Sequence, residues 1–193
     1  ADGSQYLLTL FDGDSLHLFD RDSKKPARLF KLGNETHAAT FLPDGRIAAF
    51  VSVTGTMQLQ IFGKPRDGES LELQSTTNID DGIGIHHTVS SSDGQWLAAF
   101  EYNLGGIVLW KLSGTPPQQF AKFKFRTRYA NTPPLSFSPV ANWFCFTDLS
   151  QDQSTIHLID LRGDTPREAA VLKADADEES DAPTKGFWQG VFL

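Results

Sequence analysis

The densest group of residues that could bind a metal or move protons lies at residues 78–87, Asn-Ile-Asp-Asp-Gly-Ile-Gly-Ile-His-His. Histidine and aspartate are common zinc ligands, and zinc in proteins takes three or four converging ligands. Only His86 or His87 and one aspartate are on offer here, because neighbouring residues on a strand point to opposite faces. The pattern therefore predicts a structural role at the entry of a strand, and we expect neither a metal nor a cofactor.

The single cysteine, Cys145, is a second residue that could do chemistry, as a nucleophile. It lies inside the apolar run 143–146, where a thiol is most often a small core residue with an ordinary or raised pKa. The sequence has no Gly-x-Ser-x-Gly elbow and no P-loop, which are signatures of serine hydrolases and of nucleotide-binding sites. We therefore expect no catalytic residue and predict that the protein is not an enzyme.

Residues 120–129 alternate apolar or aromatic side chains with basic ones. Because side chains on a strand alternate between its two faces, one face would carry four cations: Lys122, Lys124, Arg126 and Arg128. Such a row can bind an acidic partner or nucleic-acid phosphate. It can also be a solvated face that protects a strand edge from pairing with other chains. Both interpretations stay open at this point.

Five acidic residues lie within 175–181: Asp175, Asp177, Glu178, Glu179 and Asp181. Alternating carboxylates occur in calcium loops, but the central glycine and the closing glutamate of an EF-hand are missing here. The pattern favours a solvated, self-repelling loop, with calcium binding as the alternative.

The bulk composition limits the classes of function. The chain has 193 residues, 39% of them hydrophobic, and a formal net charge of −7. This length fits one domain over residues 1–193, and the acidic balance argues against nucleic acid as a partner. No stretch approaches the roughly 18 apolar residues of a membrane-spanning helix, and residues 1–5 show no signal peptide. We therefore expect a cytoplasmic protein that does not interact with membranes.

A unit of about four short strands repeats along the chain. Turns lie near residues 2, 44, 93 and 140, and each is followed by an apolar strand, a second turn and another strand. The latter strand carries a bulky residue 17 to 19 positions after the turn: Phe19, Phe62, Trp110 and Ile159. One more strand precedes each turn and one follows each bulky residue. No segment has helical spacing, so we predict an all-β protein with very little helix.

Four segments resemble a known repeat: Phe41–Gly45, Val108–Gly114, Phe137–Pro139 and Leu158–Gly163. With their spacing they resemble WD40 repeats, in which a unit of roughly 40–45 residues forms one four-stranded blade of a β-propeller. They are nearly as similar to the propellers found beside serine peptidases and in TolB-like proteins. The resemblance implies a β-propeller with about four four-stranded blades. The family's Gly-His pair before the innermost strand is absent here, and His37 and His86 or His87 are its nearest counterparts.

The blades can be arranged in two ways. In one, residues 186–193 pair beside residues 6–11 and close a four-bladed ring, which removes exposed sheet edges. In support of this, the sequence Gly-Val-Phe-Leu at 190–193 is similar to Ala-Thr-Phe-Leu at 39–42. In the other arrangement, the chain is an arc of a larger propeller.

The WD40 resemblance implies a non-catalytic platform for protein–protein interaction, although function must be argued from sites rather than from fold. We expect its partner to be another protein or peptide, or the missing remainder of its own propeller. Because aromatic residues are enriched in interfaces, the best-placed contact residues besides the basic row are His86, Tyr102, Phe187 and Trp188. One alternative is a sensor or regulatory portion of a larger multidomain protein. Another is an enzyme at the central channel, which three or more buried carboxylates or histidines facing the axis would favour.

Overall fold

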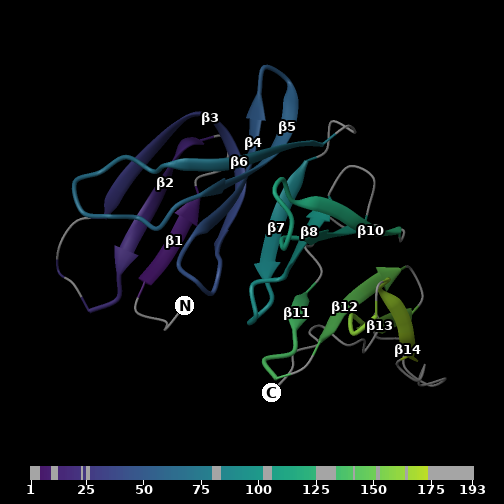
Figure 1. Ribbon diagram of the computed structural model, residues 1–193. Helices are drawn as coiled ribbons and strands as arrows, with labels where there is room; N and C mark the ends of the chain where they lie inside the picture. The colour runs from purple at the N-terminus through teal and green to yellow at the C-terminus, as the bar shows by residue number, and fades with distance from the viewer. Residues whose placement is uncertain are drawn as a thin grey trace, which may run out of the picture.

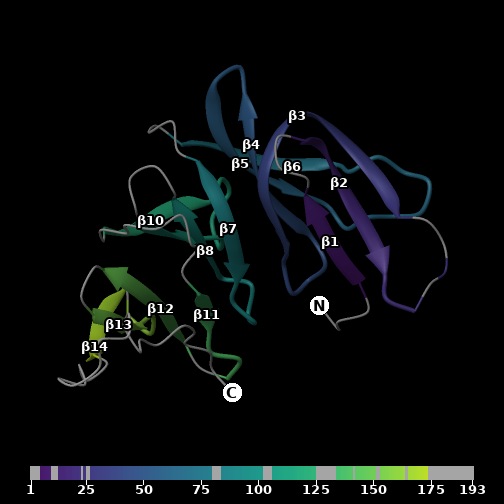
Figure 2. The ribbon, with the colours of Figure 1, turned by 180° about the vertical axis from the view of Figure 1, so that it is seen from behind.

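The computed structural model describes residues 5–9, 13–22, 24, 27–79, 84–101, 106–124, 134–140, 142–150, 153–163 and 165–173. Over these residues the chain forms fourteen strands and no helix, which confirms the all-β prediction. The strands make three sheets, and Figures 1 and 2 show these sheets following one another as an open arc. Accordingly, the described part of the chain contains no helix that could cross a membrane.

The first sheet holds two blades joined by one long strand. Its strands, in spatial order, are β1 (Gln5–Thr9), β2 (Gly13–Asp20), β3 (Arg28–Phe41), β4 (Ile47–Val53), β5 (Thr56–Phe62) and β6 (Leu73–Ile79). The first part of β3 pairs with β2 and the second part with β4. The sequence predicts two separate strands here, at 27–32 and from residue 39. The structure has one strand instead, which continues through Gly33 at a φ of +72°, a conformation that glycine adopts readily.

The other two sheets are four-stranded blades. The third blade contains β7 (Ile85–Ser90), β8 (Trp96–Glu101), β9 (Gly106–Lys111) and β10 (Gln118–Lys124). The fourth contains β11 (Leu135–Phe137), β12 (Trp143–Ser150), β13 (Gln153–Asp160) and β14 (Arg167–Lys173). Blade 1 is defined as β1, β2 and the first part of β3, and blade 2 as the rest of β3 with β4–β6. Blades 3 and 4 are β7–β10 and β11–β14.

Neighbouring blades are joined by apolar cores between their faces. Each core includes residues from both blades: Leu16 with Val51 for blades 1 and 2, Phe50 with Trp110 for blades 2 and 3, and Phe100 with Phe144 for blades 3 and 4. The middle strands β4, β8 and β9 are therefore buried on both faces. This is why they appear in the sequence as continuous apolar runs rather than as alternating patterns.

The turns at 44–45 and 93–94 share one design, which explains their repetition in the sequence. The side chain of Asp44 accepts a hydrogen bond from the backbone N–H of Arg46 at 3.0 Å, and Asp93 accepts one from Gln95 at 2.9 Å. An aspartate that bonds the backbone two residues ahead stabilises a tight turn. The glycine that follows has positive φ in both turns, +87° at residue 45 and +70° at residue 94, a conformation that favours glycine.

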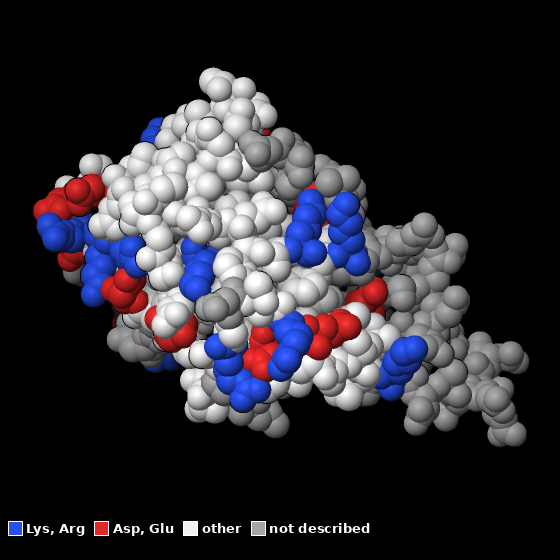
Figure 3. Space-filling view, turned by 45° about the vertical axis from the view of Figure 1, so that its right-hand side comes forward, with Lys and Arg blue, Asp and Glu red and all other residues white. Residues whose placement is uncertain are grey.

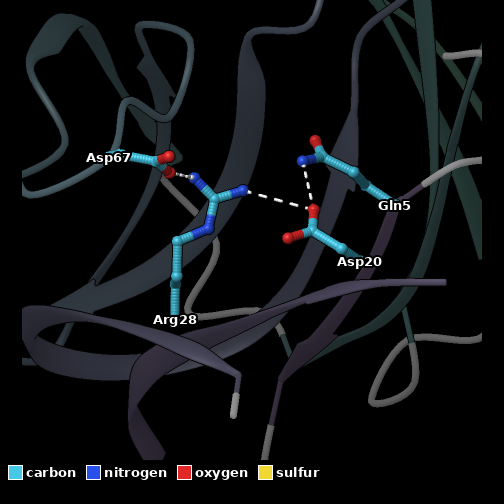
Figure 4. A network of polar contacts seen from close by, with 4 residues as sticks. All are labelled: Gln5, Asp20, Arg28 and Asp67. Carbon is cyan, nitrogen blue, oxygen red and sulfur yellow. Dashed lines mark hydrogen bonds and ion pairs between the residues drawn. The ribbon is translucent and has the colours of Figure 1, made fainter. Parts of the chain in front are cut away.

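A polar network around Arg28 also ties blade 1 to blade 2 (Figure 4). Nη1 of Arg28 lies 2.5 Å from Oδ1 of Asp67, in the loop between β5 and β6, and Nη2 lies 3.5 Å from Oδ1 of Asp20. Gln5 Nε2 donates a hydrogen bond to the same Asp20 oxygen at 2.6 Å. Because Asp67 is highly exposed, this pair contributes little stability, and the apolar core provides most of the attachment.

The arc is open over the described residues. β1 lies at the edge of its sheet, and blade 1 and blade 4 lie at opposite ends of the arc in both ribbon views (Figures 1 and 2). The predicted closing strand at 186–193 lies outside the described part of the chain. The observed architecture is a β-propeller arc of four blades, of which blade 1 has three strands in the described part.

Candidate functional site

Two histidines occupy equivalent positions on the inner strands of adjacent blades. The register of β3 against β4 slips at His37, and the register of β7 against β8 slips at His86. Each slip is a β-bulge, which breaks the alternation of side chains and re-aims the extra residue. The second part of β3 and β7 contact each other. The bulges therefore place the two imidazoles, which we call the histidine pair, at the same end of neighbouring inner strands.

The surroundings of His86 disfavour its charged form. His86 is exposed at the surface, but neighbouring atoms remove part of its solvation, and this effect and, to a smaller extent, the nearby His37 lower its pKa. The side chain of His37 is 16% exposed, and its Nε2 lies 3.5 Å from Oε1 of Glu35, which is too long for a good hydrogen bond. A neutral imidazole both donates and accepts hydrogen bonds.

A buried ion pair lies at the same end of blade 3. Glu101, the last residue of β8, is fully buried, and its Oε2 lies 2.7 Å from Nζ of Lys122 in β10. Its Oε1 has no hydrogen-bond partner among the described residues. Glu101 is paired in register with Ile85, next to the histidine pair. Because a buried carboxylate without a nearby cation is costly, Lys122 has a structural role in neutralising Glu101.

The structure divides the predicted basic row. Lys124 is exposed, whereas the side chain of Lys122 is only 16% exposed and lies against Glu101. His86 is exposed as well. The remaining predicted residues lie outside the described part of the chain: Arg126, Arg128, Tyr102, Phe187 and Trp188, together with the acidic run 175–181.

Charges on the visible surface are mixed. Figure 3 shows acidic and basic residues interspersed over one face of the molecule. Several are paired, for example Arg46 with Asp44 and Arg162 with Asp160. Hydrogen bonds from Arg162 lower the pKa of Asp160 to about 2. Paired charges of this kind leave little net field for attracting a polyanion.

The sequence contains signals for two of these features. His37 and His86 are 49 residues apart, which is also the spacing between the turns at 44 and 93. This shared spacing reveals the equivalence of the two histidines. Glu101 directly follows the apolar run 96–100. The equivalent position in blade 2 holds the buried Val51. A carboxylate at that position indicates a buried charge that needs a cation from another strand.

The single cysteine lies in the core. Cys145 is 5% exposed, and burial raises its pKa to about 11, in agreement with its predicted place in the core. Among the described residues, no three His, Cys, Asp or Glu side chains converge to hold a metal.

A hollow of about 350 Å³ lies at the other end of the strands, between the turns of blades 3 and 4. Its lining includes Ser92, Asp93 and Pro139. These groups bond to the protein itself, since Ser92 Oγ donates to the carbonyl of Pro139 at 3.1 Å and Asp93 Oδ1 accepts from Ser91 Oγ at 2.6 Å. The hollow is therefore a weaker candidate for ligand binding than the histidine end.

The chain matches solved structures over most of its length. One is a candidate 6-phosphogluconolactonase from Bacteroides uniformis, with a TM-score of 0.64, 15% identity, and coverage of 89% of this chain and 55% of that chain. Another is the periplasmic gluconolactonase of Pseudomonas aeruginosa, with a TM-score of 0.61 and 14% identity; the match covers 90% of this chain and 53% of that chain. A third is the Cps50 (Swd1) β-propeller domain from Myceliophteria thermophila, with a TM-score of 0.62 and 15% identity; the match covers 91% of this chain and 58% of that chain. No protein-family model and no curated protein matches the sequence.

At these identities the likeness shows the fold, and the fold is that of a β-propeller. The chain spans about half the length of the structures that it matches. The matches include gluconolactonase-type proteins as well as a named propeller domain, so they do not separate a WD40 propeller from other kinds.

Proposed function

We propose that the end of the arc that carries the histidine pair is a binding surface for a segment of another protein, and that it acts without catalysis. The observation that carries this proposal is the equivalence of His37 and His86 at matching bulges of contacting inner strands. Repetition of one position in successive blades gathers side chains around one axis. Because the blades pack on each other through continuous apolar cores, the surface is rigid and loses little entropy on binding.

The neighbouring groups support recognition. Glu101 and Lys122 are engaged with each other, so the charges behind the surface are compensated within the protein. His86 and Lys124 are exposed and can contact a partner. In sequence, Tyr102 follows β8 directly, and Arg126 and Arg128 follow β10. We therefore retain these residues, with Phe187 and Trp188, as the proposed partner-binding set.

The test is a peptide selection on the purified chain, followed by affinity measurements on variants. The double substitution His37→Ala and His86→Ala is expected to raise the dissociation constant of the selected peptides at least tenfold, which corresponds to about 1.4 kcal/mol of binding free energy. The reason is that a few central residues dominate the affinity of most interfaces. The control Asn142→Ala, on an exposed turn at the other end of the strands, should leave affinity unchanged. Equal binding by the double variant, or no binder at all from the selection, would contradict the proposal.

A second candidate function is lactone hydrolysis. Two of the matched proteins carry gluconolactonase-type names, and the lowered pKa of His86 keeps its imidazole unprotonated near neutral pH, the form that a general base requires. In this reaction the water adds to the ring carbonyl and the ring C–O bond breaks, giving the open-chain acid. Incubation with glucono-δ-lactone tests it directly. A rate equal to that of buffer would eliminate this candidate, and a rate lost in His86→Ala would replace the binding proposal.

A further inference from the structure

The outward face of blade 1 is apolar and uncovered. Register places Tyr6 opposite Phe19, Leu8 opposite His17, and His17 opposite Leu29, so these side chains share one face. The alternate residues of the same strands pack into the core with blade 2. We use the term blade 1 face for four exposed residues: Tyr6 (54% exposed), Leu8 (47%), Phe19 (40%) and Leu29 (50%).

The corresponding positions are buried in all the other blades. The cross-strand pair Tyr6–Phe19 corresponds to these pairs: Ile47–Phe62 in blade 2, Leu97–Trp110 in blade 3 and Phe144–Ile159 in blade 4. None of these six side chains is more than 5% exposed. Each belongs to a core shared with the blade that precedes its own. The blade 1 face therefore has the residue pattern of a face that packs against a preceding blade.

Blade 4 carries the complementary kind of face. Register places Leu172 opposite Ile156, on the side of the blade that faces away from blade 3. Leu172 is 54% exposed. Among the described blades, blade 4 is the one whose outward face has no following blade packed on it. In one molecule these two faces lie at opposite ends of the arc (Figures 1 and 2).

We propose that the blade 1 face docks the outward face of blade 4 in a second copy of this chain. Two copies related by a two-fold axis form two such contacts and close a ring, and closed symmetric assemblies are the common form of protein association. The chain spans 53% to 58% of the matched chains, so two copies supply a set of blades of about the size of one matched chain. Contiguous exposed apolar side chains of this kind typically mark interaction surfaces.

The first measurement is the mass of the purified chain in solution by light scattering and sedimentation equilibrium. The proposal predicts twice the chain mass of 21.3 kDa. The double substitution Leu8→Lys and Phe19→Lys should give the single-chain mass. Leu73→Lys, at a 51% exposed leucine of blade 2, is the matched control and should leave the dimer intact. Unchanged circular dichroism spectra verify that the variants fold.

Mixing two variants identifies the faces that meet. The variant Leu172→Lys alone should also be monomeric, because its blade 4 face is blocked. Mixed with the Leu8→Lys and Phe19→Lys variant, it should form a heterodimer through the one contact that remains intact. A monomeric wild-type chain, a mass that rises without limit with concentration, or a Leu172→Lys variant that still dimerises would each overturn the proposal.

Discussion

Replacing Lys122 by methionine is expected to lower the free energy of unfolding by about 3–5 kcal/mol, because it leaves a buried carboxylate without its cation. Glu101 is fully buried, and the Nζ of Lys122 lies 2.7 Å from its Oε2. Urea unfolding at pH 7 measures the loss.

Two further variants separate this role from a general effect of charge. Glu101→Val combined with Lys122→Met should recover most of the stability, because Val51 is buried at the equivalent position of blade 2 and an apolar pair often replaces a buried ion pair without loss. Lys124→Met, at the exposed neighbouring lysine, should change stability by less than about 0.5 kcal/mol. If Lys122→Met were as mild as Lys124→Met, the ion pair would not be buried as described.

Replacing Trp110 by alanine is expected to cost about 3–5 kcal/mol, which is the usual range for emptying a buried tryptophan site. Trp110 is 2% exposed and lies between blades 2 and 3, with its ring edge toward Phe50 at a centroid distance of 6.3 Å. The loss should appear in thermal and urea unfolding. It should also reduce amide exchange protection in both blades, because the core they share is disrupted.

The control for this prediction keeps part of the apolar volume. Trp110→Phe should cost clearly less than Trp110→Ala, because it leaves a smaller cavity and because the indole N–H has no hydrogen-bond partner among the described residues. Leu73→Ala, at a half-exposed leucine, should have little effect. A loss for Trp110→Ala no larger than for Leu73→Ala would mean that blades 2 and 3 do not pack on each other.

Much of the fold could be predicted from the sequence because repetition is a strong signal. The turns at 44–45 and 93–94 use the same aspartate–glycine geometry, and bulky residues follow them at nearly constant spacing. The predicted strands after the turns correspond to β4, β5, β8, β9, β12 and β13. The continuity of β3 could not be predicted, because a glycine such as Gly33, which has a positive φ, is typical of a strand end when only local residues are considered.

The candidate site was less predictable, because it depends on register and on contacts between blades. Residue types show that His86 and His87 are adjacent, but only the bulge in β7 determines which of them is the extra residue. Similarly, the basic alternation at 120–129 predicts solvent-facing lysines. The partner that buries Lys122 is Glu101, from another strand of the blade. Local patterns give the face of a side chain but do not show what the next strand or blade places against it.

The central claim is that the inner strands of adjacent blades bring His37 and His86 to one place around the axis. The most direct test is an NMR titration of the His86 imidazole in the wild type and in His37→Gln. We predict a pKa for His86 below the ordinary histidine value in the wild type, and a rise toward that value in His37→Gln, because one of the two causes of the depression is removed. His157→Gln, in blade 4, should leave the titration unchanged. An identical His86 titration with and without His37 would contradict the account, because the two histidines would then not share a site.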